Sequence, residues 1–298
     1  MKLSDELYRF RVTDGRDFRL ADHDCAETLG LDKDTAKDRL KEGVERLSEL
    51  QELLYAQDRW SVLAIFQAMD AAGKDSAIEH VMSGVNPQGC QVYSFKAPSA
   101  QELDHDFMWR TSQCLPERGR IGIFNRSYYE EVLVVRVRPE YLKKQRLPQE
   151  LVSDRIWDER FEDIRNFERY LARNGTIVLK FFLHVSKEEQ RQRFLARLEE
   201  PGKRWKFSLQ DVEERKLWDR YMAAYQDMIA KTAAPHAPWW VIPADKKWFA
   251  RLVVAGALVD AMQQRDLHFP KVQGAALKEL EKARKALEAE APKKRKRT

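Results

Sequence analysis

Five short runs of apolar residues are the feature that most constrains the fold of this chain. They lie at residues 61–66, 90–95, 121–124, 176–183 and 239–243. The first, third and fourth runs are almost continuously apolar, rather than alternating with polar residues. That pattern is typical of strands buried on both faces, as in parallel sheets covered by helices. The sequence therefore predicts a central parallel sheet of about five strands.

Segments with helical spacing separate these runs. Apolar residues recur at i, i+3 and i+4 across residues 40–54 and again across residues 248–262. Ser186 is followed three residues later by Glu189, which is the pattern of a capping box at the start of a helix. This alternation of strands and helices predicts a layered α/β fold, with helices on both faces of the sheet.

Composition along the chain predicts three regions and a lid. Residues 1–59 are expected to form a helical N-terminal extension, residues 60–268 the core, and residues 269–298 an exposed charged helix with a basic tail. Within the core, residues 200–233 are helical in pattern and dense in Lys, Arg and Trp. We expect this segment to act as a lid that excludes water. The alternative is an ordinary pair of surface helices.

Several classes of protein are disfavoured. The sequence holds no run of about eighteen apolar residues, so no membrane-spanning helix is expected. The first residues are charged and lack the apolar block of a secretory signal. The three cysteines, Cys25, Cys90 and Cys114, lie far apart and match neither a disulfide framework nor a zinc cluster. A cytoplasmic protein with reduced thiols is the expectation.

The most specific local pattern is A-M-D-A-A-G-K-D-S at residues 68–76, between an apolar run and a helical segment. A strand, a loop and a helix in this order form a phosphate-binding loop, because backbone N–H groups and the helix dipole favour an anion there. This context predicts a P-loop kinase-like, three-layer α/β/α fold. The residues expected to surround the phosphate are Ala71, Ala72, Gly73, Asp75 and Ser76, with Lys74 supplying an ammonium group.

The loop departs from the usual G-x-x-x-x-G-K-[ST] pattern. Ala68 replaces the first glycine, and Asp75 stands where a hydroxyl residue normally helps to hold magnesium. Ser76, one place later, is a candidate for that hydroxyl. Asp70 lies inside the loop, where a carboxylate repels phosphate unless a cation lies between them. We therefore expect Asp70 to bind magnesium or to position the acceptor.

A second polar segment, N-R-S-Y-Y-E at residues 125–130, follows the third apolar run. In P-loop kinases an acid ends this strand and helps to hold magnesium. Asn125 occupies that place here, and Glu130 is a candidate for the missing charge. Arg126 directly follows the strand end, where ligands gather in open α/β sheets, so it is expected to clamp a phosphate.

Basic residues are unevenly distributed, although the net charge is only +5. One cluster runs from Arg136 to Arg146, and the tail at residues 293–297 is entirely basic. Such runs attract polyanions. For the tail the alternative is a solvated end of the chain, and for the cluster the functional and structural interpretations are evenly balanced.

Four motifs, found in order, resemble the polyphosphate kinase 2 family. They are Q-A-M-D-A-A-G-K-D at residues 67–75, M-S-G-V-N-P-Q-G at 82–89, F-N-R-S-Y-Y-E at 124–130, and W-K-F-S with W-D-R-Y at 205–208 and 218–221. The resemblance extends from about residue 10 to residue 268. The version with Asn125 and Glu130 resembles the subgroup that accepts both AMP and ADP.

The resemblance implies direct transfer of the terminal phosphate of inorganic polyphosphate to ADP, giving ATP, and to AMP, giving ADP. It implies Mg²⁺ as cofactor, with Mn²⁺ as an alternative, and a homodimer or homotetramer; nucleic acid is not an expected partner. The implied reaction centre is Asp70, Lys74, Asn125, Arg126 and Glu130, with Asp70 as metal ligand. The implied phosphate-binding residues of the lid are Lys203, Arg204, Lys206, Asp211 and Arg215. The cluster beginning at Arg136 would be a groove for polyphosphate.

Two other functions remain open at this point. One is an ATP-dependent nucleoside or nucleotide kinase, because the same fold and loop would serve it. The other is a non-catalytic protein that binds polyanions or nucleic acid, with a vestigial loop and functional basic segments.

Overall fold

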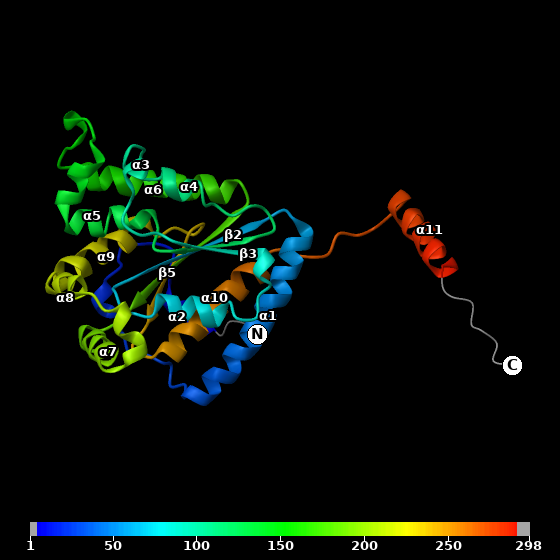
Figure 1. The fold of residues 1–298 in the computed structure, drawn as a ribbon, viewed down its shortest axis with the longest axis horizontal. Helices are drawn as coiled ribbons and strands as arrows, with labels where there is room; N and C mark the ends of the chain where they lie inside the picture. The colour runs from blue at the N-terminus through cyan, green and yellow to red at the C-terminus, as the bar shows by residue number, and fades with distance from the viewer. Residues whose placement is uncertain (1–4, 291–298) are drawn as a thin grey trace.

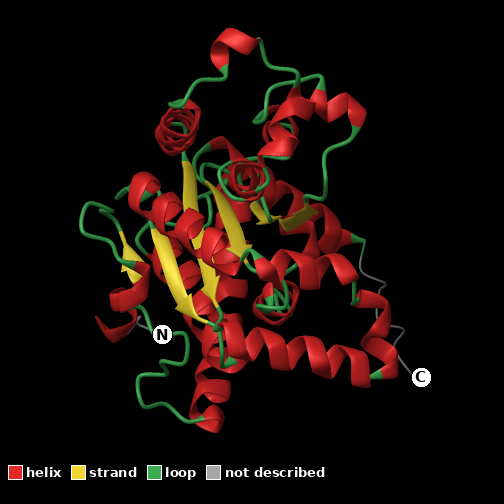
Figure 2. Cartoon of the chain, turned by 90° about the vertical axis from the view of Figure 1, so that its left-hand side faces the viewer, coloured by secondary structure: helices red, strands yellow, loops and turns green. Residues whose placement is uncertain are grey.

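A computed structural model describes residues 5–290 of the chain, without the side chains of Asp5 and Lys206. The basic tail at residues 293–297 lies outside the described residues. A six-stranded sheet forms the centre, with strand order β1-β6-β5-β2-β4-β3. Helices lie on both sides of these strands (Figure 2).

The five predicted strands are confirmed and run parallel. They are β2 (Ser61–Ala68), β3 (Cys90–Ser94), β4 (Ile121–Asn125), β5 (Thr176–His184) and β6 (Trp239–Pro243). The sheet has a sixth strand that the sequence pattern did not predict, β1 (Arg11–Val12), which pairs antiparallel with β6. Two residues are too few to produce an apolar periodicity.

The helices form the two outer layers of the predicted α/β/α fold. On one face lie α1 (Lys33–Gln57), α2 (Lys74–Val81) and α10 (Lys247–Gln263), with α10 packed against both of the others (Figure 1). On the other face, α6 (Ile156–Arg173) packs against β5 and against α9 (Trp218–Thr232). Strands β2, β4, β5 and β6 are almost wholly buried between these layers, as their continuous apolar runs predict.

Short helices complete the fold around the carboxyl ends of the strands. They are α3 (Ala100–Leu103), α4 (Trp109–Ser112), α5 (Val134–Val137), α7 (Lys187–Glu199) and α8 (Leu209–Lys216). The 3-10 helices are η1 (Asp5–Phe10), η2 (Leu20–Asp22), η3 (Pro87–Gly89), η4 (Tyr128–Glu131), η5 (Pro139–Gln145), η6 (Gln149–Leu151) and η7 (Pro201–Lys206). Ser186 caps α7 by accepting a bond from the Glu189 N–H, whereas the Glu189 carboxylate binds Arg193 instead of closing a capping box.

The structure differs from the sequence-based boundaries at two places. The described part of the predicted N-terminal extension, residues 5–59, is not separate from the core, because Leu7, Leu47 and Leu54 belong to the hydrophobic core. The predicted lid at residues 200–233 also divides in two. Helix α9 buries Tyr225 and Met228 in the core, so only the preceding η7 and α8 are largely exposed.

Helix α11 (Ala275–Ala289) lies apart from the rest of the chain, at the end of an extended connection (Figure 1). It buries no residue, in agreement with the predicted exposed charged helix. None of the helices in the described part of the chain is long and apolar enough to cross a membrane.

A buried ion pair connects the two layers on the α6 side. The Lys180 ammonium donates to Glu168 Oε2 at 2.7 Å, and neither side chain is more than 1% exposed. The hydroxyls of Tyr128 and Tyr129 both donate to Glu168 Oε1, at 2.9 and 2.7 Å. The network therefore holds η4, which begins two residues after Arg126, onto α6 and β5.

Replacing Glu168 with Ala is expected to lower the free energy of unfolding by about 3–5 kcal/mol, because Lys180 would be left as an unpaired buried charge. Urea denaturation measures this change. The matched control is the double variant Glu168→Leu with Lys180→Met, which removes both charges and is expected to lose clearly less. Equal losses in the two variants would contradict a dominant role for the charge.

His184 gives the folded protein a predictable sensitivity to acid. Its pKa is lowered to about 4, mainly by burial and also by His23, while Asp24 acts in the opposite direction. An unfolded histidine has a pKa of about 6.5. As pH falls from about 6.5 to about 4, the unfolded chain gains a proton that the folded chain excludes. This difference is expected to lower the unfolding free energy by up to about 3 kcal/mol. Urea denaturation across this pH range should show that the unfolding free energy falls less steeply in His184→Phe than in the wild type. The same pH dependence in both proteins would contradict the role of His184.

Candidate active site

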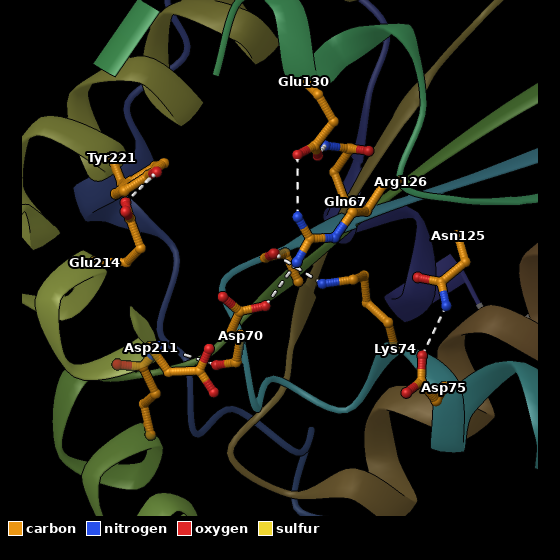
Figure 3. Close-up of polar contacts among 12 residues, drawn as sticks. Gln67, Asp70, Lys74, Asp75, Asn125, Arg126, Glu130, Asp211, Glu214 and Tyr221 are labelled. Carbon is orange, nitrogen blue, oxygen red and sulfur yellow. Dashed lines mark hydrogen bonds and ion pairs between the residues drawn. The ribbon is translucent and has the colours of Figure 1, made fainter. Parts of the chain in front are cut away.

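The carboxyl ends of β2 and β4 bring the two polar segments of the sequence together. These strands are parallel neighbours in which Phe66 is paired with Asn125. The loop at residues 69–73 leaves β2, and the segment at residues 126–130 leaves β4, so their side chains meet at one edge of the sheet (Figure 3). The structure thus brings the two predicted segments to the same edge of the sheet.

The phosphate-binding loop has the backbone that its glycine requires. Gly73 has φ +106° and is the N-terminal cap of α2, a conformation that residues with side chains rarely adopt. Ala71, at φ 63°, is also left-handed. The Lys74 ammonium reaches back across the loop and donates to the Ala68 carbonyl at 3.0 Å. The loop therefore closes around the start of α2.

Two side chains of α7 hold three consecutive carbonyl groups of this loop. Gln190 Nε2 donates to the Asp70 carbonyl at 2.9 Å. Arg193 Nη1 donates to the carbonyls of Ala71 and Ala72, at 3.0 and 2.7 Å. The same guanidinium donates through Nη2 to the Ala244 carbonyl after β6, at 2.6 Å.

These bonds also orient the donors of the loop. A trans peptide places its N–H opposite its C=O, so pinning the carbonyls of Asp70 and Ala72 directs the N–H groups of Ala71 and Gly73 away from α7. Neither of these N–H groups donates to the backbone elsewhere in residues 5–290. They are thus available to an anion. Sequence reasoning missed Gln190 and Arg193, which lie one helical turn apart.

Arg126 is the centre of a charged network. Its guanidinium donates to Asp70 Oδ1 at 2.9 Å and to Glu130 Oε2 at 3.3 Å (Figure 3). Gln67 Nε2 donates to Glu130 Oε1 at 2.8 Å. The pKa of Arg126 is raised chiefly by Glu130, with Asp70 acting in the same direction and burial opposing both. This network fixes the guanidinium beside the loop.

The site carries more negative than positive charge. Lys74 is 9% exposed, and its pKa is lowered first by burial and then by Arg126. Asp70, Glu130 and Asp75 all lie close enough to oppose that shift. Two cationic side chains therefore face three carboxylates, one of them inside the loop. A phosphate group that enters here requires an additional cation.

The strand-end residue Asn125 is bonded to the acid of the loop. Its Nδ2 donates to Asp75 Oδ1 at 2.7 Å (Figure 3). The same Nδ2 lies 3.5 Å from Ser94 Oγ. Asp75 is exposed and forms no ion pair with any described residue. Asp75 therefore places a carboxylate next to the end of β4. Ser76, the other predicted candidate, accepts a bond from Arg251 Nη2 at 2.5 Å.

The side chains around the site fit a magnesium ion only together with substrate. No group of three or more His, Cys, Asp or Glu side chains within the described residues is arranged to hold a metal. Mg²⁺ is commonly held by one or two carboxylates and the phosphates of the substrate. Asp75 at the loop has no ion pair with a described residue, and Asp70 is bonded to Arg126 through Oδ1 only. These two carboxylates fit this mode of binding.

The predicted lid residues contact α7 rather than the loop. Arg215 donates to the Lys187 carbonyl and to Gln190 Oε1, at 2.7 and 2.8 Å. Asp211 lies 4.0 Å from Arg197, and burial together with the charge of Asp70 raises its pKa. The other predicted phosphate-binding residues of the lid also have local partners: Lys203 pairs with Glu200 at 2.5 Å, and Arg204 donates to the Leu198 carbonyl at 2.8 Å. The side chain of Lys206 lies outside the described residues.

The basic cluster at residues 136–146 is largely neutralised. Arg136 pairs with Asp227 at 2.6 Å and Arg138 with Glu214 at 2.9 Å. Arg146 pairs with Asp104. All three arginines of the cluster therefore have carboxylate partners, which weakens the expectation of a polyphosphate groove there. The partners come from distant parts of the sequence, so the basic run alone could not reveal them.

Comparison with known proteins places this geometry in a family. Residues 30–270 match the family described as Polyphosphate kinase 2. The chain belongs to the polyphosphate kinase 2 family. The match includes the loop, the segment after β4, the lid and α10, but not α11.

Two relatives and one solved structure are similar to this chain over most of its length. It is 55% identical over 249 residues to an ADP-polyphosphate phosphotransferase of Rhodopseudomonas palustris, covering 83% of this chain and 86% of that protein. It is 46% identical over 275 residues to an AMP/ADP-polyphosphate phosphotransferase of Meiothermus ruber, covering 91% and 98%. The crystal structure of polyphosphate kinase 2 from Arthrobacter aurescens is similar with a TM-score of 0.85 and 37% identity, covering 96% of this chain and 97% of the other.

Proposed function

We propose that this protein transfers the terminal phosphate of inorganic polyphosphate directly to ADP, giving ATP, and to AMP, giving ADP. The observation that carries the proposal is the loop with two available N–H groups, faced by Lys74 and by Arg126 from the end of β4. This chain aligns with most of the length of both relatives. Their names support polyphosphate as donor and adenine nucleotides as acceptors.

Positioning and charge stabilisation are what this reaction requires from the protein. The transferred group spreads negative charge over its oxygens, so fixed donors lower the barrier. The N–H groups of Ala71 and Gly73, with Lys74, are proposed to bind the reacting phosphate. Arg126 is held by Asp70 and Glu130, so its guanidinium faces the phosphate without reorganisation when charge develops.

Mg²⁺ is the proposed cation, with Mn²⁺ as an alternative. Asp70 and Asp75 would hold it together with the phosphates of the substrates, and Asn125 would orient Asp75. When bound, the ion neutralises phosphate charge. The excess of carboxylates around Lys74 is the observation that supports this role.

The cellular context and the assembly follow from the same proposal. We infer a cytoplasmic enzyme, in which Cys25, Cys90 and Cys114 stay reduced. We infer a homodimer or homotetramer, on the resemblance to the family. The motif N-R-S-Y-Y-E supports acceptance of both AMP and ADP.

An assay without ATP tests the proposal. Purified protein is incubated with long-chain polyphosphate, Mg²⁺ and either ADP or AMP, and the nucleotides are separated by chromatography. ATP is expected from ADP, and ADP followed by ATP from AMP. No product in either tube, together with ATP-dependent phosphorylation of a nucleoside, would instead support the second candidate, an ATP-dependent kinase.

A further inference from the structure

A group of cationic side chains lies beside the phosphate-binding loop, at the start of α10. A Cβ atom added to Gly73 would lie 3.9 Å from Lys247 Cγ and 3.8 Å from Arg193 Nη1. One turn further along α10, Arg251 donates to Ser76 Oγ at 2.5 Å. Lys247 and Arg251 thus border the first turn of α2, directly beyond the loop.

These cations are not neutralised by the protein. Lys247 and Arg251 form no ion pair with another described residue. The pKa of Lys247 is lowered first by burial and then by Arg193, Lys203 and Arg251, so three other cationic groups lie within electrostatic reach of Lys247. Positive charge therefore accumulates at this place.

Two carboxylates act on Lys247 and Arg251. Glu189 opposes the lowered pKa of Lys247, but its carboxylate is bonded to Arg193 Nε at 2.8 Å. Glu79 acts on Arg251 without forming an ion pair with it in the described part of the chain. Four positive charges, on Arg193, Lys203, Lys247 and Arg251, face three negative charges, on Glu189, Glu79 and the Lys203 partner Glu200. One positive charge is therefore left in excess.

The start of α10 also contradicts the usual charge preference of a helix. Its N-terminal cap is Lys246, its first residue is Lys247, and its first turn contains no acidic residue. Cations are unfavourable at this positive end of the helix dipole. Asp245 directly precedes this cap, but its carboxylate accepts a bond from the Ser186 N–H at 2.8 Å. A local preference broken in this way is expected at a functional place, and an anion would relieve the repulsion here.

The two basic regions of the protein are therefore different in kind. The three arginines at residues 136–146 are each paired with a carboxylate, and only Lys143 and Lys144 of that cluster lack such a partner among the described residues. Lys247 and Arg251 both lack one among the described residues, and they adjoin the loop. A chain of phosphates that enters the loop gains more from the unpaired cations, because paired ones must first lose their partners.

We propose that the polyphosphate chain extends from the loop across the start of α10, over Lys247 and Arg251 and toward Lys203 of η7. This inference rests on the proposed function and names the path of its donor. Residues at the loop bind the reacting phosphate, and the cations of this path bind the phosphates that follow it. Longer donors reach more of these cations and bind more tightly.

The test compares donors of different length. In the double variant Lys247→Met with Arg251→Met, KM for long-chain polyphosphate is expected to rise about tenfold or more, while KM for tripolyphosphate changes less than about threefold. The KM for ADP and kcat at saturating donor should stay near the wild-type values. The slope of log KM against log salt should fall by about one for each cation removed. A KM increase that is the same for both donors would overturn the proposal.

The rival path supplies the matched control. Lys143→Met with Lys144→Met removes two exposed cations of the cluster at residues 136–146 and is expected to leave KM for long-chain polyphosphate unchanged. If this variant raises that KM and the α10 variant does not, the path runs over the cluster instead. If loss of the Arg251 bond to Ser76 lowers the melting temperature of the double variant, the single variant Lys247→Met replaces it in the comparison of KM values.

Direct binding separates failure of the path from failure of the proposed function. Calorimetric titration of long-chain polyphosphate into wild-type protein and into the α10 variant is expected to give a Kd about tenfold weaker for the variant. Equal Kd values, with ATP formed by both proteins, would remove the path and leave the function standing. No binding by wild type, with no ATP formed, would remove both.

Discussion

Replacing Lys74 with Met is expected to lower kcat for ATP formation from ADP and polyphosphate by about two orders of magnitude or more. Removal of one fixed group that stabilises developing charge typically costs this much. Lys74 is buried against the Ala68 carbonyl, so the remaining loop cannot supply another ammonium at that place. Steady-state kinetics at saturating substrates measures the change.

The control for Lys74→Met is the stability of the fold. Burial lowers the pKa of Lys74, so its removal relieves a desolvation cost and is expected to leave the melting temperature unchanged or higher. Lys74→Arg keeps the charge, but the planar guanidinium does not reproduce a compact ammonium, so only partial activity is expected. Turnover within a few fold of wild type in Lys74→Met would contradict the assignment of this loop.

Exchanging the residues of the Asp75–Asn125 pair is expected to lose and then restore activity. Asp75→Asn removes the carboxylate that stands in contact with the strand end, and the affinity for Mg²⁺ is expected to fall about 10–100-fold. Adding Asn125→Asp returns one carboxylate to the pair, on the other side of a 2.7 Å contact, and most of the affinity should return. The Mg²⁺ concentration at half-maximal rate gives the first readout.

Binding of Mn²⁺, followed by electron paramagnetic resonance in the presence of ADP, gives a second readout that does not depend on turnover. Asn125→Asp alone places two carboxylates in contact, so its effect should be larger than that of the double variant when Mg²⁺ is scarce. Additive losses in the two single variants, with no recovery in the exchange, would show that the two side chains act separately.

The sequence predicted the centre of this fold because buried parallel strands leave a direct mark. The runs at residues 61–66 and 176–183 are apolar on both faces, and a strand pattern of that kind has few alternatives. Because parallel strands end at the same edge of the sheet, their order was enough to predict that Asp70, Lys74 and Arg126 lie close together. Chain order and sheet topology sufficed for this part of the site.

The parts that sequence reasoning missed depend on contacts between distant segments. Gln190 and Arg193 bind backbone carbonyls. The spacing of apolar residues in a sequence does not predict which polar side chains make such bonds. The carboxylates Asp227 and Glu214 neutralise a basic run from about 80 residues away in the sequence. Helix α9 is different, since the spacing of Tyr221, Tyr225 and Met228 would have identified it as a core helix.

The bonds from α7 to three carbonyls of the loop affect how donors of different chain length bind to such an enzyme. Because bonds internal to the protein fix the loop, little conformational entropy is lost when the first phosphate arrives, and every donor meets the same rigid pair of amides. Preference for chain length is then decided outside the reacting centre. Substrate range and intrinsic reactivity can therefore change independently, by substitutions on different helices.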